Sequence, residues 1–235
     1  MARNASRPSE SAGPIIAPSP AVGRPLPPDE LCGIYGATSA DRMMPSRALE
    51  QWARATFIGF NPDEDGYAPD AVPLVNPDHE HLRGASIGFV WTNAINRKGG
   101  KLVLGQAQLM PPGGGDAWGR ARAAQQILEW FGEMPDFVIT LLALEAAEMD
   151  DATFCALVEH ELYHCAQKLD DYGSPCFDRA TGDPLWAIRS HDIEQFVGVA
   201  LRYGAVPSGL GPLADALASG PTVSEARMKL VCGSC

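Results

Sequence analysis

The sequence has no apolar run long enough for a transmembrane helix, and its first residues lack the continuous apolar segment of an export signal. It also lacks a basic excess, because 18 Lys and Arg stand against 29 Asp and Glu, for a net charge of -11. Phosphate binding requires a basic surface, so nucleic acid is not expected as a partner. These absences predict a cytoplasmic protein that neither crosses a membrane nor binds nucleic acid.

Cysteine is present in six copies, but no pattern of a disulfide framework accompanies them. Without an export signal, free thiols in a reducing compartment are the expected state. Cys232 and Cys235 form a C-x-x-C at the end of the chain. A zinc ribbon needs a second such pair, which the sequence does not contain. The pair is therefore expected to belong to a plain terminal tail, with a metal or redox role as the alternative.

The composition divides the chain into three parts. Residues 1–38 are rich in Pro, Ser and Ala and are predicted to form a disordered arm, because they cannot bury enough apolar surface to offset their ordering entropy. Residues 39–206 carry the periodic apolar patterns of a globular domain. Residues 207–235 are predicted to form a helical tail that ends in the C-x-x-C.

The periodic patterns predict an α+β fold. Helical periodicity is present in residues 46–60, 117–131, 152–167 and 191–203. Strand-like runs occupy residues 85–96, 101–109 and 137–143. The first two runs flank a Gly-Gly turn and are expected to pair as an antiparallel hairpin. The order of these elements predicts a small, mostly antiparallel sheet with helices packed on it.

The predicted helix at residues 152–167 contains His160-Glu161-Leu162-Tyr163-His164, a complete H-E-x-x-H. Residues four apart lie on one face of a helix, so His160 and His164 can bind the same ion. Glu161 follows about 100° further round the helix, where its carboxylate can take a proton from metal-bound water. This chemistry is typical of a zinc hydrolase, in which Glu161 is the catalytic base.

A catalytic zinc ion usually has three protein ligands and a water. His191, at the start of the last predicted helix, is the preferred third ligand, because the turn-rich loop before it can fold back over the motif. Glu194, and then Asp170 or Asp171, remain alternatives. Asp192 and Glu194 are also candidates for a carboxylate that holds a zinc-bound histidine in place.

Other residues near these motifs stay open as candidates. Tyr163, Arg189 and Tyr203 could each stabilise an oxyanion, although each could equally serve packing or the surface. His79 and His81 form an H-x-H that could hold a second metal ion, with an ordinary loop as the alternative.

Three segments together resemble the phage and prophage metallopeptidases. They are DFVIT at 136–140, CALVEHELYHCAQ at 155–167 and HDIEQFVGVALRYGA at 191–205, and NPDHEHL and LGQAQ belong to the same pattern. The resemblance implies that residues 39–206 are a zincin-like metallopeptidase domain. It also implies zinc bound by His160, His164 and His191, with Glu161 as catalytic acid and base.

The residues and the resemblance lead to a zinc-dependent peptidase that acts on a peptide or protein substrate, which an open sheet edge could hold as an added strand. Two alternatives remain. The substrate could be the peptide or amide bonds of a cell wall, as in phage lysis. The protein could instead be a non-enzymatic accessory protein stabilised by zinc, although such a protein has no use for Glu161.

Overall fold

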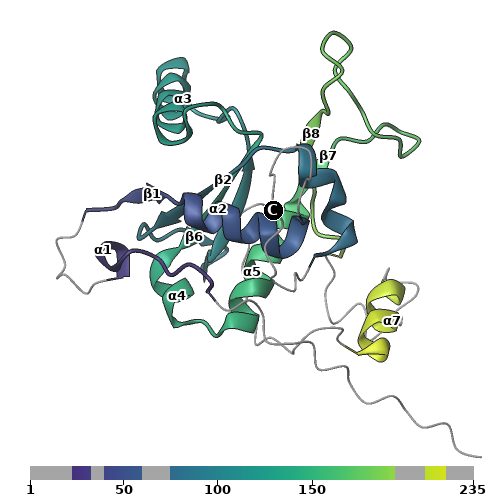
Figure 1. Cartoon of the computed structure of the whole chain (residues 1–235), viewed down its shortest axis with the longest axis horizontal. Helices are drawn as coiled ribbons and strands as arrows, with labels where there is room; N and C mark the ends of the chain where they lie inside the picture. The colour runs from purple at the N-terminus through teal and green to yellow at the C-terminus, as the bar shows by residue number, and fades with distance from the viewer. Residues whose placement is uncertain (1–22, 33–39, 60–74, 194–209, 221–235) are drawn as a thin grey trace, which may run out of the picture. The chain divides into compact units, whose positions relative to one another are not determined.

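The computed structural model describes residues 23–32, 40–59, 75–193 and 210–220. Of these, the residues up to Asp192 belong to one compact unit, and Ile193 with residues 210–220 belongs to another. Figure 1 shows the chain as a cartoon with its helices and strands labelled. The second unit contributes helix α7 (Gly211–Ser219). The first unit contains all the other described elements.

A four-stranded sheet in the order β1-β2-β6-β5 forms the centre of the first unit. Strand β6 is paired in parallel with β2 and antiparallel with β5, while β1 is antiparallel to β2. Together with the helices this makes an α+β fold, as the sequence predicted. The strands comprise β1 (Met43–Pro45), β2 (Ile87–Thr92), β5 (Gly105–Leu109) and β6 (Phe137–Leu142).

The predicted hairpin between residues 85–96 and 101–109 is wrong. β6 lies between β2 and β5, so these two strands do not pair. The physical reason is burial: β6 reads FVITLL, is covered on both faces and therefore takes a central position. Only a short ribbon forms at the predicted turn, from β3 (Arg97–Lys98) and β4 (Lys101–Leu102).

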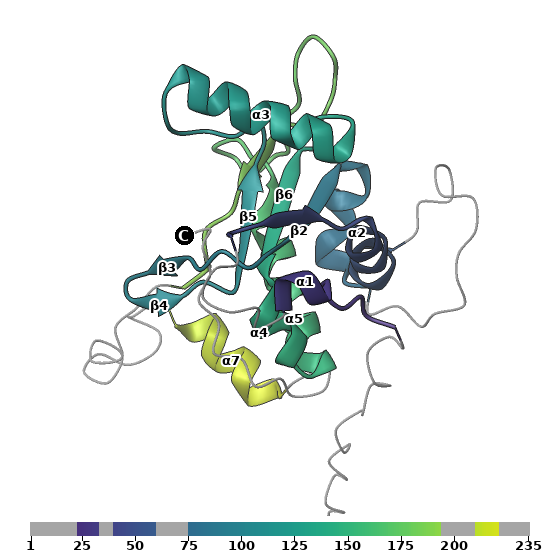
Figure 2. The same cartoon turned by 90° about the vertical axis from the view of Figure 1, so that its left-hand side faces the viewer.

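Helices cover the two faces of the sheet unequally. The large core lies on the face that packs against α2 and α5, and it contains Phe89, Phe137 and Phe154, all buried. A smaller cluster of Val90, Ile127 and Val138 lies under α3 on the other face. Figure 2 shows α3 crossing near the end of β5. The helices comprise α2 (Arg47–Ala53), continued as one π-helical segment (Arg54–Ile58), α3 (Ala117–Phe131), α4 (Ala143–Glu148) and α5 (Asp151–His164).

A short segment from the predicted arm also belongs to this unit. Helix α1 (Asp29–Cys32) buries Leu31 in the main core, and Arg24 contacts the connection between α4 and α5. A 3-10 helix, η2 (Pro77–Gly84), packs against the π-helical segment and precedes β2 in the chain. The four cysteines in the described residues, Cys32, Cys155, Cys165 and Cys176, are free thiols.

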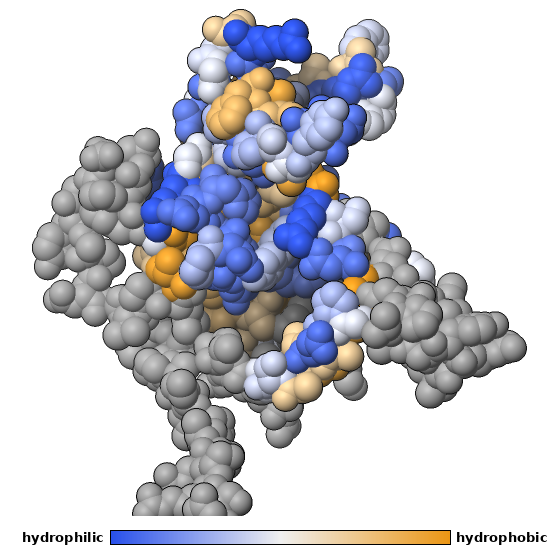
Figure 3. Space-filling view, turned by 90° about the vertical axis from the view of Figure 1, so that its right-hand side faces the viewer, coloured by the Kyte–Doolittle hydropathy of each residue, from blue (hydrophilic) through white to orange (hydrophobic). Residues whose placement is uncertain are grey.

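The length and apolarity of the described helices, and the surface shown in Figure 3, bear on whether these helices could span a membrane. Among the described residues, no helix is both long enough and apolar enough to cross a bilayer. On the face shown in Figure 3, hydrophilic side chains dominate the described part, and hydrophobic ones form separate patches.

Candidate metal centre

Helix α5 carries the H-E-x-x-H motif. Asp150 caps its first turn by accepting a hydrogen bond from the amide of Thr153 at 2.8 Å. The helix ends at His164, three residues before the predicted end. It ends there because Cys165–Gln167 forms strand β7, which pairs with β8 (Trp186–Ile188). The last histidine of the motif is therefore held between a helix and a strand.

The β7–β8 pair returns the chain to the motif helix. In β7 and β8, Cys165 lies opposite Ile188, and the amide of Arg189 donates to the carbonyl of His164 at 2.9 Å. Residues 168–185 connect the two strands, form two isolated antiparallel bridges (Leu169–Pro175 and Phe177–Pro184) and extend away from the sheet (Figure 1). His191, two residues beyond this pairing, is thereby brought back beside α5.

Three histidines converge at this point: His160, His164 and His191 each offer a ring nitrogen, and these atoms lie within 4.8 Å of one another. The Nε2 atoms of His160 and His191 are 3.1 Å apart, and the three ring centroids are 4.9–5.0 Å apart. Such a group, with at least three His, Cys, Asp or Glu side chains that could hold a metal ion, occurs once among the described residues.

The second nitrogen of His164 has a defined partner. Its Nδ1 lies 2.6 Å from the carbonyl oxygen of Arg189. A carbonyl can only accept a hydrogen bond, so Nδ1 carries the proton and Nε2 keeps the lone pair that a metal ion needs. The carbonyl of Arg189 thus holds the His164 ring in the tautomer that a metal ligand needs.

The electrostatics of the cluster also suit metal binding. Burial, together with the neighbouring rings of His164 and His191, lowers the pKa of His160 to about 4. His160 is therefore neutral at pH 7, and only a neutral imidazole can bind a cation. Tetrahedral zinc with N–Zn bonds of about 2.0–2.1 Å would separate two ligand nitrogens by about 3.3 Å. The Nε2 separation of 3.1 Å fits that value.

Glu161 does not belong to the histidine cluster. Its side chain is fully buried and faces β5, where its Oε2 accepts a hydrogen bond from the amide of Ala107 at 2.9 Å. β5 is the last strand in the order of the sheet, so this contact places the carboxylate at a sheet edge. The sequence motif predicted a carboxylate next to the metal ligands but gave no indication of this contact.

Tyr163 lines the same pocket as the three histidines, together with Arg189, Ser190 and Asp192. Its hydroxyl donates to Asp78 at 3.0 Å and accepts from the amide group of Asn76 at 2.8 Å. Burial raises the pKa of Tyr163, and the carboxylates of Asp78 and Glu159 add to the effect. The phenol is therefore neutral, and its hydrogen bonds join Asn76 and Asp78 at the start of η2 to α5.

His79 and His81 of η2 face different partners. His79 is buried, with its Nε2 3.7 Å from a carboxylate oxygen of Glu159 and its ring against Tyr163. His81 Nε2 donates to the carbonyl of Cys165 at 2.9 Å. The two side chains therefore do not form one donor set for a second metal ion. Instead, both contact the segment that carries the H-E-x-x-H motif.

The remaining candidates have other positions. Asp192 pairs with the guanidinium of Arg189 rather than with a histidine. Asp170 accepts hydrogen bonds from Tyr172 and Ser174 within a turn, and neither it nor Asp171 joins the histidine cluster. The candidates outside the described residues are Glu194, Tyr203, Cys232 and Cys235.

The comparisons with known proteins agree with the chemistry of this site. Residues 64–218, more than half of the chain, match the model of the family described as "Putative phage metallopeptidase". The matched stretch contains the three histidines, Glu161 and η2. No curated protein and no solved structure matches the chain.

Proposed function

Because the chain belongs to the phage metallopeptidase family, we propose that it hydrolyses peptide bonds with a zinc ion held by His160, His164 and His191. The observation that carries the proposal is the convergence of three ring nitrogens within 4.8 Å. Three neutral nitrogen donors that leave a fourth position for water are typical of catalytic zinc. The backbone contact of His164 Nδ1 supports its role as a ligand.

Bound zinc would lower the pKa of its water ligand to about 7. Glu161 follows His160 directly, so the helix directs its side chain to the neighbouring side of the cluster. In this proposal Glu161 accepts a proton from the water and later gives it to the leaving amine. The hydrogen bond from Ala107 holds the carboxylate for this purpose. Burial keeps bulk water away from it.

The substrate proposed is a peptide in extended conformation. β5 lies at the edge of the sheet, and extended peptides can bind such an edge as an added strand. Glu161 contacts this strand at Ala107. A peptide that runs along β5 would therefore pass the carboxylate, which supports the assignment of the edge as the substrate site.

Replacement of Glu161 by Gln tests the proposal. The Gln side-chain oxygen can still accept from Ala107 but cannot take a proton, so turnover should fall about 10²–10⁴-fold while the zinc content stays unchanged. Glu159→Gln is the matched control, because Glu159 lies on the same helix but contacts Asn76 and His79. Denatured proteins and cell-wall peptides are assayed in parallel. Equal turnover of Glu161→Gln and the wild type would contradict the mechanism.

A further inference from the structure

Gly105, the first residue of β5, leaves space that Glu161 fills. A Cβ atom on Gly105 would lie 2.6 Å from Oε1 of Glu161 and 2.9 Å from both its Cδ and its Cγ. Such distances do not occur between nonbonded atoms, so a side chain at this position would displace Glu161. Gly105 does not have a positive φ angle. Its backbone would accept any residue, and the requirement for glycine is therefore one of space.

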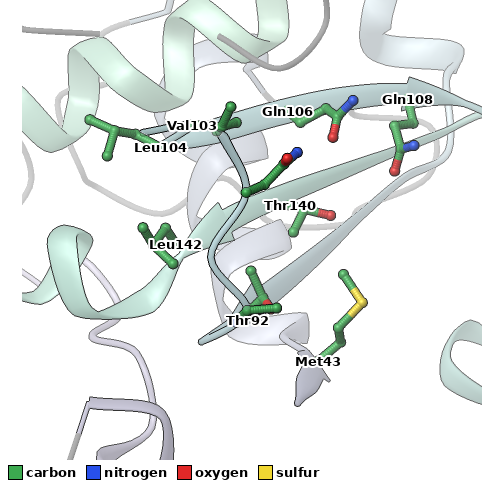
Figure 4. Close-up of a pocket in the computed structure, with 11 residues that line it drawn as sticks. Met43, Thr92, Val103, Leu104, Gln106, Gln108, Thr140 and Leu142 are labelled. Atoms are coloured by element: carbon green, nitrogen blue, oxygen red, sulfur yellow. Dashed lines mark hydrogen bonds between the residues drawn. The ribbon is translucent and has the colours of Figure 1, made fainter. Parts of the chain in front are cut away.

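The same strand fixes the carboxylate by a hydrogen bond. Alternate residues of a strand point to opposite faces, so Gly105 and Ala107 share the face towards α5. Gln106 and Gln108 project from the opposite face into a separate pocket, shown in Figure 4 with Thr140. Gly105 thus gives room to the carboxylate, and two residues further on the amide of Ala107 donates to its Oε2 at 2.9 Å.

We propose that Gly105 is a positioning residue for Glu161: the missing side chain at 105 lets the carboxylate lie against β5, where the amide of Ala107 orients it. This inference rests on the proposed function of Glu161 as the base. Besides the H-E-x-x-H motif, the site then requires a glycine at position 105, two residues before Ala107, whose amide holds Glu161. The segment LGQAQ at 104–108 contains this pattern.

Gly105→Ala is the direct test. Relief of the contact from 2.6 Å to an ordinary 3.4 Å requires a displacement of about 0.8 Å. A misplacement of this size in catalytic machinery lowers turnover about 10²-fold. We expect kcat of Gly105→Ala to fall by that factor, with KM and the zinc content within about twofold of the wild type. The control is Gly88→Ala, whose added Cβ would lie 2.6 Å from the ring of Phe131 on the other face of the sheet. It should cost stability but leave kcat of the folded protein unchanged.

A double-mutant cycle separates positioning from general disturbance of the sheet. Glu161→Asp shortens the side chain by one methylene and draws the carboxylate away from Gly105. In the Glu161→Asp background, Gly105→Ala should therefore lower kcat by less than about threefold. A 10²-fold loss in both backgrounds, or unchanged kcat in the single variant, would overturn the inference.

A crystal structure of Gly105→Ala gives a readout that does not depend on activity. The carboxylate of Glu161 should move by about 0.8 Å or more, with the three histidines in place; an unmoved carboxylate would overturn the inference even if no substrate were known. The two proposals fail differently. If Glu161→Gln is inactive and Gly105→Ala is fully active, only the positioning role is wrong. If Glu161→Gln is fully active, the proposed function is wrong.

Discussion

Arg24 is expected to contribute substantially to stability although it lies in the stretch for which the sequence predicts a disordered arm. Its guanidinium donates to the carbonyl oxygens of Ala146 and Met149 and to the carboxylate of Asp151. It also lies 4.7 Å from the ring centre of Phe154. The side chain is only 10% exposed. Arg24 therefore joins the N-terminal segment to the start of α5, the helix that carries His160 and His164.

Replacement by Ala removes all these contacts. The two hydrogen bonds to the partly buried carbonyls contribute about 1 kcal/mol each to the free energy of unfolding. This value is at the lower end for a charged donor because solvent is near. The cation–π contact adds about 0.5–1 kcal/mol, and the half-exposed Asp151 adds little. The sum is about 2–3 kcal/mol, which corresponds to a fall in Tm of about 4–12 °C in a domain of this size. Urea unfolding followed by circular dichroism measures the first quantity, and calorimetry measures the second.

Arg24→Lys is the matched control. Lysine keeps the positive charge but lacks the planar fork that reaches several acceptors at once, so its loss of stability should lie between wild type and Arg24→Ala. The zinc content of both variants should remain that of the wild type. A loss below about 0.5 kcal/mol for Arg24→Ala would refute the reasoning, because it would mean that the N-terminal segment is not part of the folded unit.

Two further predictions concern α5. Asp150→Ala removes the cap on Thr153 and should lower the free energy of unfolding by about 1 kcal/mol in urea titrations, whereas Asp150→Asn should cost only a few tenths. Burial raises the pKa of the Cys155 thiol to about 12, with the carboxylates of Asp151 and Glu159 adding to the effect. The native state therefore keeps this proton while the unfolded chain loses it near pH 9, so stability should fall as pH rises from about 9 towards 12. Cys155→Ala should show a shallower alkaline decline, and an identical pH profile would contradict this.

Local patterns predicted three of the described helices well, whereas the helix predicted at residues 191–203 lies largely outside the described residues. The helix predicted at residues 117–131 coincides with α3, and Asp116 caps it. Ser46 caps α2 at the predicted start. The apolar stripe of the motif helix, including Phe154, Leu157 and Leu162, is buried. These features depend on neighbours within a few residues, so the sequence pattern contains the information needed to predict them.

Long-range pairing was the part that local patterns did not predict. The insertion of β6 between β2 and β5 depends on contacts between segments about 30 to 50 residues apart, which periodicity does not encode. The same holds for the contact of Glu161 with Ala107 and for Arg24 on α4 and α5. The motif spacing pointed to His160 and His164, and the turn-rich loop before His191 made it the preferred third ligand; the structure brings these three histidines together. The β7–β8 pairing that returns His191 had no clear signal in the sequence.

Metal analysis of the purified full chain is the decisive test of whether His160, His164 and His191 bind one zinc ion. We expect one equivalent of zinc in the wild type and in His81→Gln, whose side chain lies outside the cluster. Each of the variants His160→Ala, His164→Ala and His191→Ala should bind zinc more weakly than the wild type. The loss should exceed the factor of about 10–100 that is expected when only a hydrogen-bond partner of a ligand is removed. A wild type that binds no metal, or a His191→Ala variant that binds zinc as tightly as the wild type, would contradict the account.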